Sequence, residues 1–312
     1  MRAFLFPGQG SQSVGMGDAL GRASRAARDT FAEVDEALNQ HLFKLMREGP
    51  EDELKLTENA QPVIMAHAIA VFAALTKEGG VDLTKAAQFV AGHSLGEYSA
   101  LCAAGSFGLP NTAKLLKIRG KAMQAAVPVG VGAMAALLGA DVELARKIAA
   151  AAAEGEVCEV ANDNDPSQVV LSGHASAIER AIGLAKGMGA KRAVQLPVSA
   201  PFHCSLMQPA ADAMSDALSY EVLMAPAVPL YANVTAEPAS DPDTIRGQLV
   251  EQVTGMVRWR ESIANMAAAG VEEFIELGGR VLGPMVKRIA PEAKVTSVVT
   301  IEDVEALAKE IH

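Results

Sequence analysis

The segment 88–101 constrains the fold of this chain more than any other. An apolar run at 89–91 leads into the sequence Gly-His-Ser-Leu-Gly at 92–96, and a helix-forming stretch follows. A serine with glycines two positions before and after it is typical of a sharp strand-to-helix turn, because the turn leaves no room for Cβ atoms at its flanks. Such a turn raises the Ser94 hydroxyl above the sheet and points the Leu95 N–H at a developing oxyanion. We interpret Ser94 as a nucleophile; the alternative is a glycine-rich connection without chemistry.

Length and composition limit the class of protein. The chain has 312 residues, of which 50% are hydrophobic, so it can bury a large core. Its formal net charge of -10 argues against a nucleic-acid partner, which normally meets a basic face. The N-terminal apolar run is too short for a signal peptide and no run approaches a membrane span, so we expect a cytoplasmic protein with no membrane partner. The three cysteines lack C-x-x-C spacing and predict neither a disulfide framework nor a zinc site.

A glycine-rich loop, residues 7–17, follows the first predicted strand. It lacks the third glycine of G-x-G-x-x-G and the Lys-Ser/Thr pair of a P-loop, so it does not predict a phosphate site. Its backbone amides are poorly covered by side chains, and Gln9 lies between two glycines. Two interpretations stay open: a second oxyanion donor, or a plain strand-to-helix turn.

Helical spacing of apolar residues predicts a helix over 25–38, and Pro62 predicts the first turn of a second helix that ends near 75. A third helix, beginning at Pro110, carries Arg119 in the middle of an apolar stripe. A buried guanidinium is costly unless a carboxylate meets it, and its planar fork binds a carboxylate through two hydrogen bonds. The partner is either an internal Asp or Glu or a carboxylate of the substrate.

The middle of the chain has a different pattern. Residues 128–197 predict the order strand, helix, strand, strand, helix, strand, which is that of a ferredoxin-like unit. We interpret 128–197 as an inserted subdomain, and 1–127 with 198–312 as a large α/β catalytic subdomain. Strands that alternate with helices predict a mostly parallel sheet in the large subdomain, with catalytic loops at the carboxyl ends of its strands.

A serine nucleophile needs a base, and His203 is the best candidate among the six histidines. It lies in a short proline-flanked segment without the periodicity of a core helix, which favours a ring held for chemistry. Of the other histidines, His93 adjoins the serine and His312 is terminal. The remaining three lie in predicted helix or subdomain positions: His41, His67 and His174.

These residues resemble a known family, the malonyl-CoA:acyl-carrier-protein transacylases of fatty-acid synthesis together with the related acyltransferase domains of polyketide synthases. The motifs that carry the resemblance span nearly the whole chain in the family's order: Phe6–Gln12, Gln61-Pro62, Gly92–Tyr98, Arg119, Asn162, Phe202-His203, Gln252 and Val257–Trp259. The resemblance implies a hydrolase-like, mostly parallel α/β body with an inserted ferredoxin-like subdomain and an active site between them. Two departures, Gly255-Met256 and Gly279-Arg280, are loop positions outside the implied site.

The resemblance also implies catalytic roles by position. Ser94 would be the nucleophile and His203 its base. A carbonyl at the position of Gln252 would orient the histidine in place of an aspartate, fixing its tautomer while stabilising an imidazolium less well. The amides of Gln9 and Leu95 would hold the oxyanion.

Three further positions would bind substrate. Arg119 would hold the free carboxylate of malonyl, and Asn162 would complete the substrate-binding set. In the related domains, Phe before the histidine goes with malonyl and Ser with the branched methylmalonyl unit. Phe202 therefore favours malonyl, because its ring fills the space of the extra methyl.

The implied reaction is ping-pong transfer of malonyl from malonyl-CoA to the phosphopantetheine thiol of acyl carrier protein, which supplies the extender unit for fatty-acid synthesis. We expect no metal and no cofactor. Because carrier proteins of this pathway are acidic, we predict a basic docking patch; the alternative is that these are ordinary solvated charges. The candidates are Lys191, Arg192, Arg280, Lys287 and Arg288.

Three other functions stay open at this point. A serine thioesterase or hydrolase would share the nucleophile and base but use water, without needing Arg119. A polyketide-pathway acyltransferase would carry out the same chemistry on another carrier. A non-catalytic binding module would form no acyl-serine.

Overall fold

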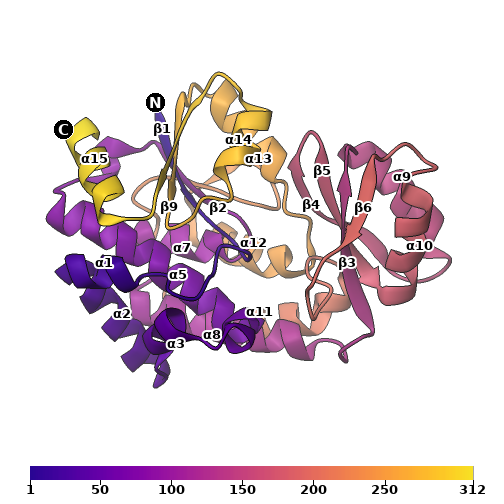
Figure 1. Cartoon of the computed structure of the whole chain (residues 1–312), viewed down its shortest axis with the longest axis horizontal. Coiled ribbons are helices and arrows are strands. Elements are labelled where there is room, and N and C mark those ends of the chain that lie inside the picture. Colours follow the sequence, from indigo (N-terminus) through magenta and orange to yellow (C-terminus); the bar gives the residue numbers. More distant parts are fainter. Residues whose placement is uncertain (312) are drawn as a thin grey trace.

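The main sheet has six strands in the order β10-β9-β1-β2-β7-β8 in the computed structural model, which describes residues 1–311 (Figure 1). All neighbouring strands run parallel except β7 and β8. The strands are β1 (Arg2–Phe6), β2 (Phe89–Gly92), β7 (Leu230–Tyr231), β8 (Pro238–Ala239), β9 (Glu273–Leu277) and β10 (Lys294–Val298). The predicted α/β class with a mostly parallel sheet is confirmed.

Both faces of the central strands β1 and β2 are buried, which fits their almost wholly apolar sequences. Side chains alternate along β1, so Phe4 and Phe6 enter one core while Ala3 and Leu5 enter a second. The larger core is built with α2 (Arg25–Leu38), α5 (Thr57–Ala73), α7 (Gly96–Ala103), α8 (Leu109–Ala125), α11 (Gln208–Ser219) and α12 (Pro242–Thr254). The smaller core is built with α13 (Trp259–Ala268) and α14 (Gly283–Ile289).

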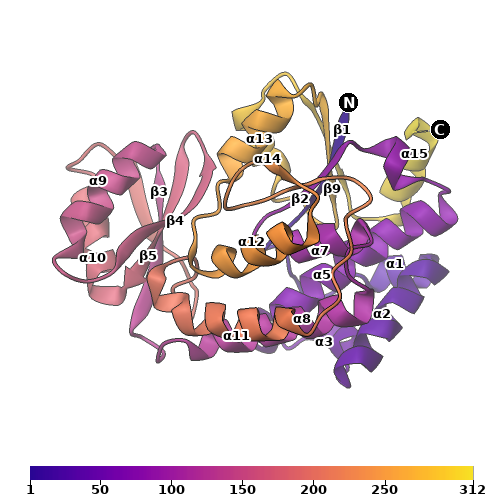
Figure 2. The same cartoon turned by 180° about the vertical axis from the view of Figure 1, so that it is seen from behind.

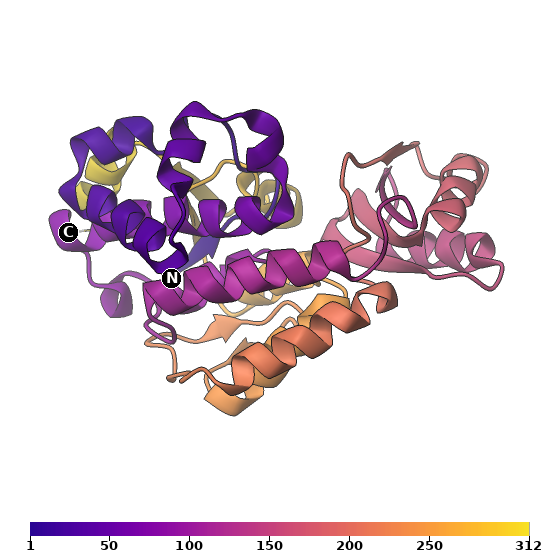
Figure 3. The same ribbon diagram turned by 90° about the horizontal axis from the view of Figure 1, so that it is seen from below.

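Shorter helices complete the body, and α2 covers the predicted range 25–38. The remaining helices of the body are α1 (Asp18–Ala23), α3 (Leu42–Glu48), α4 (Glu51–Lys55), α6 (Leu83–Ala86) and α15 (Ile301–Ile311), with a 3-10 turn η2 (Ser205–Met207) before α11. Seen from behind and from below, α11 packs between α8 and α12 on one side of the sheet (Figures 2 and 3).

α5 begins earlier than the sequence predicts. The expected start at Pro62 is wrong, because the helix begins at Thr57 and Pro62 lies inside it. The fixed φ of proline fits a helix, and the missing N–H removes only the bond to the carbonyl of Glu58. Burial of nearly the whole helix in the larger core offsets that loss.

The expectation that no run approaches a membrane span is also corrected. The helix Thr57–Glu78, which joins α5 to the π-helical turn η1 (Ala74–Glu78), has 22 residues and contains an 18-residue window with a mean hydropathy of 1.3, enough by length and composition to cross a membrane. Yet 89% of its apolar window is buried inside the protein. A helix that is surrounded by other helices needs apolar residues on all its sides.

A second sheet of four strands lies beside the body, in the order β4-β5-β3-β6 (Figure 1). All its pairs are antiparallel, as the ferredoxin-like order predicts. It comprises β3 (Gly132–Leu138), α9 (Val142–Ala153), β4 (Cys158–Asp165), β5 (Gln168–His174), α10 (Ala175–Ala185) and β6 (Arg192–Gln195). One face of the sheet and the two helices enclose a separate hydrophobic core.

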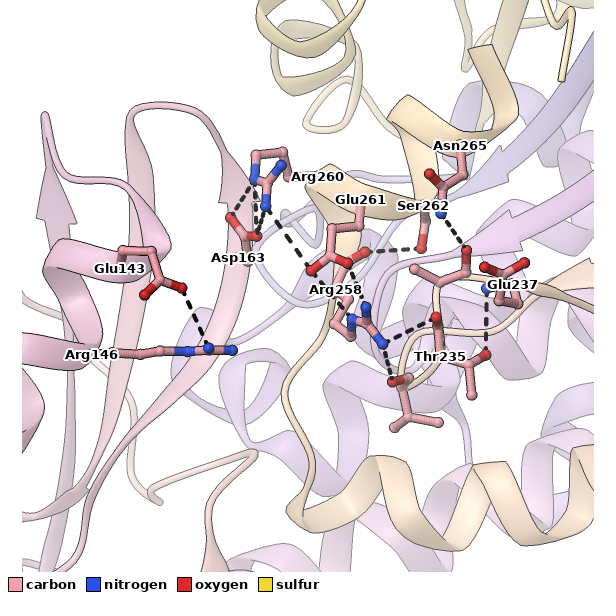
Figure 4. Close-up of polar contacts among 12 residues, drawn as sticks. Glu143, Arg146, Asp163, Thr235, Glu237, Arg258, Arg260, Glu261, Ser262 and Asn265 are labelled. Atoms are coloured by element: carbon pink, nitrogen blue, oxygen red, sulfur yellow. Dashed lines mark hydrogen bonds and ion pairs between the residues drawn. The ribbon is translucent and has the colours of Figure 1, made fainter. Parts of the chain in front are cut away.

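The two units meet along β4. Val257 donates its N–H to the Ala161 carbonyl at 2.8 Å, and its own carbonyl accepts the Asp163 N–H at 3.0 Å. The buried Asp163 carboxylate also binds Arg260 of α13 at 2.8 Å (Figure 4). Backbone bonds and a buried ion pair therefore fix β4 against the body.

The turn after β2 is as tight as its sequence predicts. A Cβ on Gly92 would lie 1.9 Å from the carbonyl carbon of Gly96, and one on Gly96 would lie 2.3 Å from the carbonyl oxygen of Phe6. Ser94 has a φ of 55°, a conformation that is costly for a residue with a side chain. The close contact of two glycines with each other and with the end of β1 therefore determines where Ser94 lies.

We expect Gly92→Ala to destabilise the fold by more than about 3 kcal/mol, because its methyl group would overlap backbone atoms that cannot move aside. Gly247→Ala is the control, since a Cβ there meets nothing within 4 Å on α12. It should be neutral or stabilising by up to about 1 kcal/mol. Urea unfolding measures both, and an unchanged unfolding free energy for Gly92→Ala would show that the turn tolerates a side chain.

Candidate active site

Ser94 and His203, which are distant in the chain, form a hydrogen-bonded pair. Ser94 lies on the turn between β2 and α7, and His203 on the segment before α11. Their Oγ and Nε2 atoms are 2.7 Å apart. His203 Nδ1 lies 2.8 Å from the backbone carbonyl oxygen of Gln252. A carbonyl can only accept, so Nδ1 carries the proton and Nε2 is left to accept the Ser94 hydroxyl proton.

The surroundings of His203 keep its ring neutral. Burial, and then the positive charge of Arg119, lower the pKa of His203 to about 3, although the bond to the Gln252 carbonyl acts in the opposite direction. A neutral imidazole can take a proton without first losing one. The pair therefore has the geometry and the protonation state of a nucleophile and its general base.

Arg119 is buried without an ion pair inside the described part of the chain. Its Nη1 donates to Gln61 Oε1 at 2.8 Å, and its Nη2 donates to Gln252 Oε1 at 2.9 Å and to Ser94 Oγ at 3.2 Å. Burial lowers the pKa of Arg119. The sequence left two partners open for Arg119, an internal carboxylate or a carboxylate of the substrate. In the described residues the guanidinium pairs with no internal carboxylate and meets amide oxygens instead.

A cavity of about 430 Å³ lies over this pair, between the body and the smaller unit. Seven of the eight predicted site residues line it: Gln9, Ser94, Leu95, Arg119, Asn162, Phe202 and His203. Gln252 lies behind the lining, fully buried. Asn162 and Met134 come from the smaller unit, and Leu196–Val198 lead from that unit back to the body. Apolar walls around a few converging polar groups are typical of a substrate site.

The glycine-rich loop reaches this cavity because Gly8 approaches the turn closely. A Cβ on Gly8 would lie 2.6 Å from the His93 carbonyl oxygen. Gln9 and Gly10 consequently line the same cavity as Ser94. On the other side of the turn, the His93 ring donates from Nε2 to Asn164 Oδ1 at 2.8 Å, which ties it to β4.

A family model described as "Acyl transferase domain" matches residues 3–282. The chain is 45% identical, over 92% of its length and 92% of the relative, to a malonyl CoA-acyl carrier protein transacylase of Escherichia coli strain K12. The chain belongs to the acyl transferase family, among the malonyl CoA-acyl carrier protein transacylases. The resemblance seen in the sequence is thereby confirmed.

Solved structures of this acyl transferase family share the fold. An acyl-carrier-protein-S-malonyltransferase from Bartonella henselae has 52% identity and a TM-score of 0.97, with 99% of each chain covered. A malonyl-transacylase solved in complex with its type II PKS acyl-carrier protein has 37% identity and a TM-score of 0.95, again with 99% of each chain covered. The fold class is therefore confirmed with both of its sheets.

Behind the cavity of this acyl transferase lies a polar network of which the sequence analysis named Gln252 but not the partners Asn233 and Glu97. Asn233 Oδ1 accepts the Ser94 N–H at 2.9 Å, and Asn233 Nδ2 donates to the Gly92 carbonyl at 2.7 Å. Gln252 Nε2 donates to the Ser94 carbonyl at 3.0 Å and to Glu97. The one signal available in the sequence was Glu97, which lies in the first turn of an apolar helix. Like Arg119, it is an ionisable residue among apolar ones.

Glu97 is a buried carboxyl group in this network. Burial raises the pKa of Glu97 to about 8, while hydrogen bonds from Asn233 N–H and Gln252 and the charge of Arg119 oppose that rise.

Within residues 1–311, no group of three or more His, Cys, Asp or Glu side chains is arranged to hold a metal ion.

We expect the His203 ring to stay neutral, with its proton on Nδ1, when the pH is lowered from 8 to about 5, because its pKa lies far below the usual value of about 6.5. Nitrogen-15 NMR of the ring measures both the charge and the tautomer. A His203→Gln variant identifies the signals. A protonation midpoint near 6.5 would contradict the buried, cation-flanked environment.

Proposed function

We propose that this acyl transferase moves malonyl from malonyl-CoA to the phosphopantetheine thiol of an acyl carrier protein through a malonyl-Ser94 intermediate. One observation carries the proposal: a Ser–His pair and a buried arginine without an internal ion pair face the same cavity. The pair supplies a nucleophile, and the arginine supplies a site for an acyl group that ends in a carboxylate. The names of the matched relatives agree with this chemistry.

In the first half-reaction, His203 Nε2 takes the Ser94 proton while Oγ attacks the thioester carbonyl. The amides of Gln9 and Leu95 hold the oxyanion. The tetrahedral intermediate then expels CoA, whose sulfur takes the proton from His203. In the second half-reaction, His203 takes the proton of the carrier thiol, the thiolate attacks the malonyl ester, and the proton returns to Ser94 Oγ.

Arg119 holds the malonyl carboxylate. Its fork is already fixed by two amide oxygens, and neither of them neutralises its charge. A bound carboxylate restores the ion pair that a buried guanidinium lacks, which favours malonyl over acetyl. Phe202 and Asn162 complete the substrate-binding set on the cavity wall, Phe202 by excluding a branched acyl chain.

The carrier protein docks through a basic patch near the mouth of the cavity. Lys191 and Arg192 are exposed at the start of β6, the strand that leads to the cavity-lining residues 196–198, and within residues 1–311 they form no ion pair. The other candidates have internal partners, since Arg280 pairs with Asp303, Arg288 pairs with Asp165, and Lys287 donates to backbone carbonyls.

Two broader assignments belong to the same proposal. Residues 1–127 with 198–312 form the large catalytic subdomain and 128–197 the inserted one, supported by two separate sheets with separate cores. A cytoplasmic location is part of the proposal, because malonyl-CoA and a carrier protein are its substrates. A polyketide carrier is the second candidate acceptor, since one matched complex is named for a type II PKS carrier protein.

We expect malonyl-CoA to release one CoA per chain in a burst and to leave one malonyl group on Ser94, because the deacylation step needs a thiol. Intact-protein mass spectrometry measures the adduct, with Ser94→Ala as the control that forms none. A phosphopantetheinylated carrier should then discharge it. Discharge by water at the same rate would identify a thioesterase, and an absent adduct would identify a non-catalytic binding module.

We expect Arg119→Ala to slow acylation by malonyl-CoA about tenfold to a hundredfold more than acylation by acetyl-CoA. Hydrogen bonds to a charged group contribute about 1.5 to 3 kcal/mol, and only malonyl has the carboxylate. Lys114→Ala, on the exposed side of the same helix, is the matched control. Stopped-flow CoA release gives both rates, and an unchanged ratio would exclude Arg119 as the carboxylate clamp.

A further inference from the structure

Glu97 has no role in the steps described above, yet it is one of the most enclosed ionisable groups of the molecule. It lies in the first turn of α7, directly after the Ser94 turn, and is 1% exposed. No Lys, Arg or His side chain forms an ion pair with it in residues 1–311. Its two oxygens instead accept one hydrogen bond each, from Asn233 N at 2.8 Å and from Gln252 Nε2.

The acceptors around its nitrogen, Glu97 among them, determine which way the Gln252 amide faces. Three acceptors surround Gln252 Nε2: a Glu97 oxygen, the Ser94 carbonyl at 3.0 Å and Asn233 Oδ1 at 3.2 Å. Gln252 Oε1 is thereby left to accept from Arg119 Nη2 at 2.9 Å. The amide has one accepting and one donating end, so an acceptor fixed at its nitrogen keeps its oxygen toward the arginine.

The second bond to Glu97 fixes Asn233 beside the nucleophile. Glu97 accepts the backbone N–H of Asn233, whose side chain spans the turn from the Gly92 carbonyl to the Ser94 N–H. One carboxyl group thus holds the residue that braces the turn and the residue that orients the guanidinium. Buried networks of this kind act as a unit, because each amide has a single satisfying orientation.

We propose that Glu97 is a positioning residue for the transfer: through Gln252 it holds the Arg119 fork in the orientation that receives the malonyl carboxylate, and through Asn233 it braces the Ser94 turn. This inference rests on the proposed function. Glu97 touches neither the acyl group nor the reacting atoms, so its effect passes through Gln252 and Asn233.

Glu97→Gln separates this role from simple filling of space. Glutamine has nearly the same volume but only one acceptor oxygen. It can satisfy Asn233 N or Gln252 Nε2, and its amino group then faces the other donor. Reversal of the Gln252 amide would relieve that clash, but it would turn the Gln252 amino group toward Arg119 and displace the fork.

The experiment compares acylation of Ser94 by malonyl-CoA and by acetyl-CoA, measured as kcat/KM from stopped-flow CoA release. We expect Glu97→Gln to lower the malonyl-to-acetyl ratio about tenfold, because only malonyl uses the fork. A role in folding alone would lower both rates together. Glu276→Gln is the matched control, since Glu276 is also fully buried but accepts from the backbone N–H groups of 281–283 and from the Ser297 hydroxyl, away from Gln252 and Asn233. Its ratio should equal that of the parent chain.

Gln252→Ala tests the route, because it removes the amide but keeps the backbone carbonyl that binds His203. We expect it to lower the ratio as Glu97→Gln does, and the double variant to have the ratio of Gln252→Ala alone. An unchanged ratio in either single variant, or independent effects that multiply in the double variant, would overturn the inference. If Glu97→Gln does not fold, Gln252→Ala still decides. A parent chain that forms no malonyl-Ser94 would instead overturn the proposed function, and this inference with it.

Discussion

The contact between the Ser94 turn and the end of β1 is the constraint on which the site depends. Gly92 and Gly96 bring the backbone of the turn within reach of the Phe6 carbonyl, at distances that no Cβ could occupy. Because β1 lies in the middle of the sheet and is buried from Ala3 to Phe6, the turn is anchored to a central strand of the body. The glycine-rich loop leaves the same end of β1, so Gln9 and Ser94 arrive at one cavity from neighbouring strands.

The electrostatics of the site follow from burying a cation without its counterion. Arg119 is held by the amide oxygens of Gln61 and Gln252, which fix its direction and leave its charge available. The same charge, added to burial, keeps His203 neutral and ready to accept a proton. A malonyl carboxylate bound to Arg119 would offset that charge, so substrate binding itself would raise the basicity of the histidine. In the proposed function, carboxylate recognition and proton transfer would therefore be coupled through one guanidinium.

The smaller unit supplies one wall of the cavity, and its fixed position matters because the cavity lies between two separately built cores. β4 is attached by backbone bonds to Val257 and by the Asp163–Arg260 ion pair, while Asn164 of the same strand binds the His93 ring next to the nucleophile. Glu261 lies beside this ion pair, 4.0 Å from Arg260. It also pairs with Arg258, which stands just before α13 (Figure 4). The wall is thus tied both to the body and to the catalytic turn.

The sequence by itself predicted most of the elements and the candidate reacting groups. The G-x-S-x-G spacing predicted the turn, period and order predicted both sheets, and residue chemistry singled out Ser94, His203 and Arg119, because these signals are local. It misjudged the start of α5, where tertiary burial overrode the tendency of Pro62 to open a helix. Only the tertiary structure decided that Arg119 meets amides and no internal carboxylate within residues 1–311, and that Glu97 and Asn233 join one hydrogen-bond network with Gln252 and the Ser94 turn. Those are contacts between residues distant in the chain, such as Ser94 and Asn233, and no local pattern encodes them.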